Sequence, residues 1–179
     1  MTDRERLITK FTLTEEGRFA NDKLDCETIC GIARNSFPKE FAEAMIIYKT
    51  NGLLAVQNYA FEFYDYNFWH PLYDSIEDTS LLQQLFDFGV NAGKPTAIKL
   101  LQLSINKCRD EIYLSVDGVF GNHTLEAVNK ISKENKAGLS ESLLHNTYED
   151  VIEKWYRRRK KFWYYGKGWL RRLRKVFNL

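Results

Sequence analysis

Two carboxylic acids and a hydroxyl lie close together near the N-terminus of this sequence. Asp25 follows Glu16 by nine residues, and Thr28 lies three residues beyond Asp25. A carboxylic acid at a helix end can protonate the leaving oxygen of a glycosidic bond, while a second carboxylate across a polar loop stabilises the oxocarbenium-like centre or positions water. The spacing alone also fits a structural role, because Glu is common at helix ends and Asp favours turns.

The segments around these residues predict a helix followed by a long loop. Within residues 4–16 the apolar side chains recur at near-helical spacing, which predicts a helix that ends near Glu16. Glycine, asparagine and aspartate punctuate residues 17–37, so we expect an irregular loop there, and the pattern leaves a short β-hairpin open. A loop of this length inside a compact domain usually has a function.

The rest of the chain predicts helices almost throughout, so the expected fold class is mainly α. Gly52 divides the first long helical stretch, Thr79 and Ser80 supply caps for the next helix, and Gly93 ends it. The last two helices are expected to separate at Gly166 and Gly168. The predicted helices span residues 39–50, 53–69, 79–91, 95–107, 123–134, 141–164 and 167–177.

Length and composition indicate a globular protein with two halves. A chain of 179 residues, 44% hydrophobic and 28% charged, fits one domain or a domain with a small appended half. The stretch 74–79 is the best internal boundary, so we expect halves at residues 1–78 and 79–179 that pack together as one compact unit. The cysteines lack nearby histidines, which argues against zinc and predicts free thiols at Cys26, Cys30 and Cys108.

The basic residues are concentrated near the C-terminus. Eleven of the 26 Lys and Arg residues lie between Lys154 and Lys175, where there is no Asp or Glu. This asymmetry predicts an anionic partner surface, such as a cell-wall polymer, lipid head groups or nucleic acid. The alternative is a solvated basic helix that docks on the acidic remainder of the chain.

Three separate segments carry motifs that occur in the same order in one known family. The first contains Glu16-Gly17, Asn21-Asp22, Asp25, Thr28 and Gly31-Ile32. The second contains residues 85–93, then Ala97 with Leu100-Leu101-Gln102, then residues 117–121 and Thr124-Leu125. The third is Gly168-Trp169-Leu170 with Arg172. Together they resemble the family 108 glycoside hydrolases, lysozyme-like N-acetylmuramidases of bacteria and phages, some of which were first labelled secretion activators.

The resemblance implies a lysozyme-like helical domain that cleaves the β-1,4 bond between N-acetylmuramic acid and N-acetylglucosamine in peptidoglycan. By position, Glu16 corresponds to the family's general acid, whose pKa would have to be raised by an apolar, partly desolvated setting. Asp25 and Thr28 correspond to residues that position water or stabilise the transition state. The resemblance implies no metal and no organic cofactor.

The resemblance also implies substrate contacts outside the loop, and a helical peptidoglycan-binding second half. Tyr64 and Trp69 lie in the aromatic helix that flanks the family's groove, with core packing as the alternative for at least one of them. Asn91 either contacts substrate or caps the helix end beside Gly93. Three other polar residues are expected to be structural or to lie at the surface, namely Asp87, His70 and His123.

The chain departs from the family pattern within the loop. Arg18 replaces a second glycine, and the loop after Asp25 is two residues short because Cys26-Glu27 stands where the family has a glycine pair. A shorter loop can shift Asp25 or Thr28 by distances that matter to catalysis, which makes Glu27 a candidate substitute carboxylate. The alternative function is therefore a catalytically impaired peptidoglycan-binding or secretion-associated protein on the same fold.

The sequence also gives expectations about partners and place. The N-terminal residues are charged, with no apolar run behind them that a signal peptide would need. We therefore expect synthesis in the cytoplasm and action on the cell wall, in the periplasm, after release or non-classical export. The expected partners are peptidoglycan strands and an anionic surface bound through residues 154–175. No specific nucleic-acid motif is recognised, and we expect a monomer.

Overall fold

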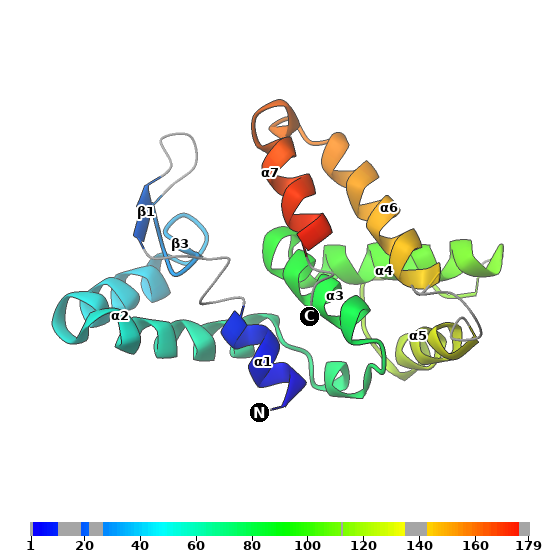
Figure 1. Cartoon of the computed structure of the whole chain (residues 1–179), viewed down its shortest axis with the longest axis horizontal. Coiled ribbons are helices and arrows are strands. Elements are labelled where there is room, and N and C mark those ends of the chain that lie inside the picture. The colour runs from blue at the N-terminus through cyan, green and yellow to red at the C-terminus, as the bar shows by residue number, and fades with distance from the viewer. Residues whose placement is uncertain (1, 11–18, 22–26, 112, 135–142, 176–179) are drawn as a thin grey trace. The chain divides into compact units, whose positions relative to one another are not determined.

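The computed structural model describes residues 2–10, 19–21, 27–111, 113–134 and 143–175. Most of these residues are helical, with one small sheet, which confirms the mainly α fold class (Figure 1). The chain divides into two units, Met1–Trp69 and His70–Leu179. No helix within the described ranges combines the length and the apolarity that crossing a membrane requires.

The first unit contains α1 (Asp3–Lys10), a small sheet and α2 (Pro38–Phe68). The strands β1 (Phe19–Asn21), β2 (Glu27–Ile29) and β3 (Ile32–Ala33) form an antiparallel sheet in that order. The hairpin that the sequence left open within residues 17–37 is therefore present, and one more strand is paired to it. The helix predicted over residues 4–16 is described only as far as Lys10.

The turn between β2 and β3 consists of Cys30 and Gly31. Both residues have positive φ, 45° at Cys30 and 75° at Gly31, and Ile29 pairs with Ile32 across the turn. Positive φ at both central residues is the mark of a type I′ turn, whose twist matches that of the paired strands. Cys30 is fully buried, so the surrounding core must hold it in a conformation that side chains rarely adopt.

α2 is two helical segments that meet at Gly52. Gly52 has φ 83° and ψ −172°, which interrupts the helix and confirms the predicted division there. Pro38 lies in the first turn, where its missing N–H would have had no partner. α2 packs against α1, β2 and β3, and the second segment buries one face, formed by Val56, Ala60, Phe63 and Tyr64.

The second unit begins with a short 3₁₀ helix, η2 (Pro71–Ser75). It continues with α3 (Thr79–Ala92), α4 (Lys94–Arg109), α5 (Asn122–Glu134), α6 (Leu143–Arg157) and α7 (Phe162–Lys175). α4 packs against α3, α5 and α6, and α7 packs against α6 (Figure 1). Their apolar faces meet in a common core that includes Leu85, Leu101, Ile105, Val128, Leu144 and Ile152.

The two ends of α3 are set by Asp78 and Gly93. The N-cap is Asp78, whose carboxylate accepts a hydrogen bond from the Leu81 N–H at 3.0 Å. Thr79 and Ser80, the predicted caps, therefore lie inside the helix. The predicted end is confirmed, because Gly93 has φ 85° and donates its N–H to the Gly89 carbonyl.

The predicted break between the last two helices was wrong. α6 ends at Arg157 and α7 begins at Phe162, so the connection is residues 158–161, and Gly166 and Gly168 lie inside α7. This connection consists of consecutive cations, which are unfavourable inside a helix because like charges one turn apart repel each other. Gly166 has a packing role instead, because a Cβ there would lie 2.7 Å from the ring of Phe162.

Candidate functional site

The two predicted carboxylic acids lie outside the described residues. Glu16 falls within residues 11–18 and Asp25 within residues 22–26. The described elements on either side of them are α1 and the paired strands β1 and β2, with Asn21 opposite Glu27. The catalytic assignments of Glu16 and Asp25 therefore stay predictions, and the structure informs the residues that follow them.

Thr28 and Glu27 are neighbours on β2 and point to opposite faces of the sheet. Side chains alternate along a strand, so Glu27 shares a face with Ile29, which is buried in the core. Thr28 lies on the other face, half-buried, with Ala20 and Ala33 as its register partners. The Glu27 Oε2 lies 2.5 Å from Arg34 Nη1 in an ion pair. Glu27 is therefore held by a cation and cannot share a ligand-facing position with Thr28.

Tyr64 holds the turn that follows Thr28. Its hydroxyl donates a hydrogen bond to the Cys30 carbonyl at 2.9 Å, and the side chain is only 1% exposed. The rings of Phe63 and Phe68 pack around it, with centroids at 5.2 and 5.8 Å. The prediction that Tyr64 contacts substrate is corrected by this burial, because its one polar atom is directed at the hairpin.

Trp69 likewise lies in the core of the first unit. It is 5% exposed, and the guanidinium of Arg4 lies 5.8 Å from its ring centroid. Arg4 also binds Asp65 on α2 through both of its carboxylate oxygens. Trp69 therefore helps to fix α1, the helix that precedes Glu16 in the sequence. The prediction that Trp69 contacts substrate is corrected by its burial, as it is for Tyr64.

Asn91 is the one predicted substrate contact that lies at the surface. It is exposed in the last turn of α3, and its Nδ2 donates to the Asp87 carbonyl at 2.8 Å, one helical turn earlier. It also lines a groove of about 520 Å³ in the second unit. One amide hydrogen is therefore used within the helix, and the rest of the side chain lines the groove. The substrate contact of Asn91 stays a prediction.

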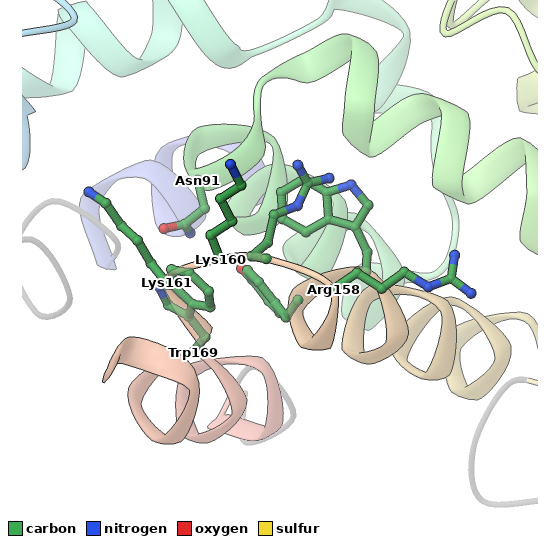
Figure 2. A pocket seen from close by; sticks show the side chains of 8 residues that line it. Asn91, Arg158, Lys160, Lys161 and Trp169 are labelled. Atoms are coloured by element: carbon green, nitrogen blue, oxygen red, sulfur yellow. The ribbon is translucent and has the colours of Figure 1, made fainter. Parts of the chain in front are cut away.

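Cations and aromatic side chains line this groove. The cations come from the connection between α6 and α7, and the aromatic residues come from the last turn of α6 and the middle of α7. In Figure 2, Lys160 and Lys161 point to the same side of the groove as Asn91, whereas Arg158 points away. The lining residues are Asn91, Trp155, Tyr156, Arg158, Arg159, Lys160, Lys161 and Trp169.

A stack of aromatic rings forms the floor of the groove. Trp169 stacks on Tyr156 and on Tyr165, with ring centroids at 5.1 and 5.8 Å. The guanidinium of Arg159 lies only 3.5 Å from the ring centroid of Trp155. Burial raises the pKa of the Tyr156 phenol above its ordinary value, and the nearby Asp87 carboxylate raises it further. The floor is therefore neutral, and the charge lies on the cations around it.

An ion pair anchors the last helix beside the groove. Arg172 Nη2 lies 2.9 Å from Asp87 Oδ1, and Arg172 Nε donates to the same oxygen at 3.0 Å. Both side chains are mostly buried. Asp87 therefore has the structural role expected of it. It also joins the second and third motif segments in space, although they are far apart in sequence.

The remaining motif residues of the second unit form a loop clasp. Gln102 Nε2 donates to Asp117 Oδ1 at 2.8 Å, and Gln102 Oε1 accepts from the Gly118 N–H at 2.9 Å. Gly118 has φ 83°, and a Cβ there would meet the Pro95 carbonyl oxygen at 2.9 Å. A hydrogen bond from the Val119 N–H, and a second from the Gln102 side chain with a smaller effect, hold the pKa of the Asp117 carboxyl below its usual range. These three motif residues therefore hold the loop before α5 in its fold.

His70 and His123 have the structural and surface positions expected of them. His70 Nδ1 accepts from the Leu72 N–H at 3.2 Å and caps η2. Burial lowers the pKa of His70, and Lys94 lowers it further. His123 is exposed at the start of α5. Within the described ranges, no group of three or more His, Cys, Asp and Glu side chains is arranged to hold a metal.

The comparison with protein families decides the identity of the chain. Residues 9–93 match the model of the family described as Glycosyl hydrolase 108, and residues 96–174 match a model described as Predicted Peptidoglycan domain. The first half of the chain, residues 9–93, belongs to the glycosyl hydrolase 108 family. The two matches together cover both motif-bearing halves, so this member of the family carries the peptidoglycan domain as its second part.

A solved structure supports the fold of this glycosyl hydrolase 108 member. The structure of Brucella abortus SagA aligns with a TM-score of 0.69, over 97% of this chain and 90% of that chain. The sequence identity is 21%, so the likeness shows a shared fold. No curated protein matches the sequence significantly.

The family boundaries and the structural units divide the chain differently. The glycosyl hydrolase 108 match runs to residue 93 and includes α3, whereas α3 packs within the second unit. The division predicted at residues 78 and 79 falls between these two. Asn91 therefore belongs to the hydrolase part by sequence and to the helical unit with the basic groove by structure.

Proposed function

We propose that this glycosyl hydrolase 108 member is an N-acetylmuramidase that cleaves the β-1,4 bond between N-acetylmuramic acid and N-acetylglucosamine, with Glu16 as general acid. The observation that carries the proposal is the family match over residues 9–93, which contains Glu16, Asp25 and Thr28, followed directly by a peptidoglycan domain. A hydrolase joined to a wall-binding part is suited to a polymeric, insoluble substrate, because binding keeps the active site at the polymer.

In the proposed reaction the Glu16 carboxyl donates its proton to the glycosidic oxygen as the bond from that oxygen to C1 breaks. Positive charge develops at C1 and the ring oxygen, and the Asp25 carboxylate stabilises it or orients the incoming water. The water oxygen then bonds to C1, and its proton is taken up by a carboxylate. In this proposal Thr28 hydrogen-bonds to water or substrate, which is supported by its place on the face of β2 opposite the buried Ile29.

The decisive experiment measures the release of reducing ends from purified peptidoglycan. After the enzyme has acted, borohydride reduces the newly exposed sugar, and acid hydrolysis then releases it for identification. Muramitol, rather than glucosaminitol, identifies muramidase cleavage. Glu16→Gln removes the donated proton with little change in shape, and we expect a rate loss of about 100-fold or more. Glu15→Gln is the matched control, because it makes the same change one residue earlier. Full activity of Glu16→Gln would overturn the assignment.

A second candidate function is a peptidoglycan-binding or secretion-associated protein without hydrolase activity. It is favoured by the loop after Asp25, which lacks the family's two glycines, and by the ion pair that ties Glu27 to Arg34. A folded preparation that binds sacculi and releases no reducing ends would establish it. Under either function we expect a monomer that reaches the periplasmic cell wall after release or non-classical export.

A further inference from the structure

The strongest unassigned feature of the molecule is the basic groove of the second unit. Its cations, Arg158, Arg159, Lys160 and Lys161, are consecutive in the connection between α6 and α7. They are exposed, and the motif residues Asp87 and Arg172 are already used in the ion pair described above. The groove therefore carries a net positive charge that the folding of the unit does not require.

The acidic side chains nearest in sequence are already paired with other cations. Asp150 pairs with Lys154 at 2.5 Å, and Glu153 pairs with Arg157 at 2.6 Å. Glu153 also lies 3.6 Å from Arg174. Among the described residues, no carboxylate forms an ion pair with Arg159 or Lys160. An anion that enters the groove would consequently meet cations rather than the protein's own carboxylates.

The aromatic floor favours an anionic ligand over a stacked sugar. The indole of Trp169 is stacked against two tyrosines, and the ring of Trp155 lies under the Arg159 guanidinium. These ring faces are covered by the protein itself, so they serve to position cations. A guanidinium stacked on an indole loses less conformational freedom when it binds a carboxylate, because its orientation is already set.

Asn91 adds a polar group of a different kind to the same groove. Its Nδ2 is engaged with the Asp87 carbonyl, which orients the amide oxygen as an acceptor for an incoming N–H. The groove thus offers carboxylate-binding cations beside an acceptor for an amide N–H. A peptide that carries free carboxylates has both complementary groups.

We propose that this groove binds the peptide stems of peptidoglycan, with Lys160, Lys161 and Arg159 taking their carboxylates and Asn91 an amide N–H. The inference rests on the proposed function, because it specifies which part of the wall polymer the second unit recognises. A hollow site with a fixed amide acceptor suits a short peptide with discrete charges better than it suits a flat lipid surface. The exposed Trp163 and Tyr164 lie outside the groove lining.

The test is the affinity of the full chain for purified sacculi, with Glu16→Gln present throughout so that the sacculi stay intact. Lys160→Gln with Lys161→Gln should weaken binding about fivefold or more, since each removes one charge contact. Lys107→Gln with Lys130→Gln is the matched control, because both residues are exposed on α4 and α5 and the change in charge is the same. We expect the control to bind within about twofold of the parent chain.

Two further arms distinguish the ligand. Sacculi stripped of their stems by an amidase should bind the parent chain as weakly as intact sacculi bind the groove variant. The exchange Arg158→Lys with Lys160→Arg keeps the charge and should retain binding to intact sacculi. Equal binding of intact and stripped sacculi would overturn the inference. So would a groove variant that loses binding to vesicles of anionic lipid while it keeps full binding to sacculi.

Reducing-end release by the chain with native Glu16 keeps this inference separate from the proposed function. Hydrolysis together with unchanged sacculus binding by the groove variant would sink only the stem-binding inference. Absence of hydrolysis, with stem-dependent binding through the groove, would sink only the muramidase proposal.

Discussion

The aromatic residues of the two units lie in opposite settings. In the first unit, Tyr64 and Trp69 are enclosed by the core, and their polar or cationic contacts fix the hairpin and α1. In the second unit, Trp155 and Trp169 remain half-exposed and line a groove beneath a row of cations. An aromatic residue near a site can therefore support the loop that carries the chemistry or support the charges that bind the ligand. Burial distinguishes the two roles, whereas residue type does not.

The comparison also separates the charges. The candidate chemistry of the first unit depends on carboxylates, which suit proton transfer and stabilisation of a cationic transition state. The charged side chains that line the groove of the second unit are all cations, which suit the retention of an anionic polymer. The division is consistent with one unit that cleaves and one that holds.

The largest stability effect is expected from the ion pair that anchors α7 in the second unit. Asp87→Asn leaves the Arg172 guanidinium without its carboxylate in a mostly buried place, and we expect a loss of about 2–3 kcal/mol in the free energy of unfolding. Urea unfolding followed by circular dichroism would measure it. Asp150→Asn, which breaks the exposed pair with Lys154, should cost only ~0.3 kcal/mol. Equal losses for the two variants would remove the anchoring role.

A smaller effect, on activity rather than stability, should distinguish the two faces of β2. Thr28→Val keeps the shape and removes the hydroxyl, and we expect about a tenfold loss of kcat from one lost hydrogen bond. Glu27→Gln breaks only the surface pair with Arg34 and should change kcat by less than about twofold. The reducing-end assay measures both. A larger loss of kcat for Glu27→Gln than for Thr28→Val would make Glu27 the substitute carboxylate. It would also contradict the assignment of the Thr28 face of the sheet as the side that meets the substrate.

Helical periodicity and glycine chemistry predicted much of this fold. The break at Gly52 and the end of α3 at Gly93 follow from local backbone preference, which a sequence displays directly. The glycine at position 166 has a tertiary reason instead, because it leaves space for the ring of Phe162 inside α7. The cap at Asp78 cannot be distinguished from the sequence, because the two residues after it have equally good cap chemistry.

The candidate sites were predicted less evenly than the fold. The run of cations was visible as a charge asymmetry, but its neighbour Asn91 is more than sixty residues away in sequence. Only the packing of α3 with α6 brings the two together. Tyr64 and Trp69 could not be separated from groove residues by pattern, since an aromatic residue on a helix is equally able to face a core or a ligand. Their roles depended on burial, which is a property of the whole unit.

The smallest effect should come from the contact that ties the aromatic helix to the hairpin. Tyr64→Phe keeps the ring but removes the buried hydrogen bond to the Cys30 carbonyl, and we expect a loss of about 1–2 kcal/mol in stability. Because this turn fixes the strand that carries Thr28, kcat should also fall by a few fold while KM changes little. Tyr59→Phe removes a hydroxyl from the same helix, where it donates to Glu43 at the surface, and should be close to neutral in both measurements. If Tyr64→Phe lowered stability but left kcat untouched, the hydroxyl would serve the core alone, and the first unit's aromatic helix would have no part in positioning the candidate active site.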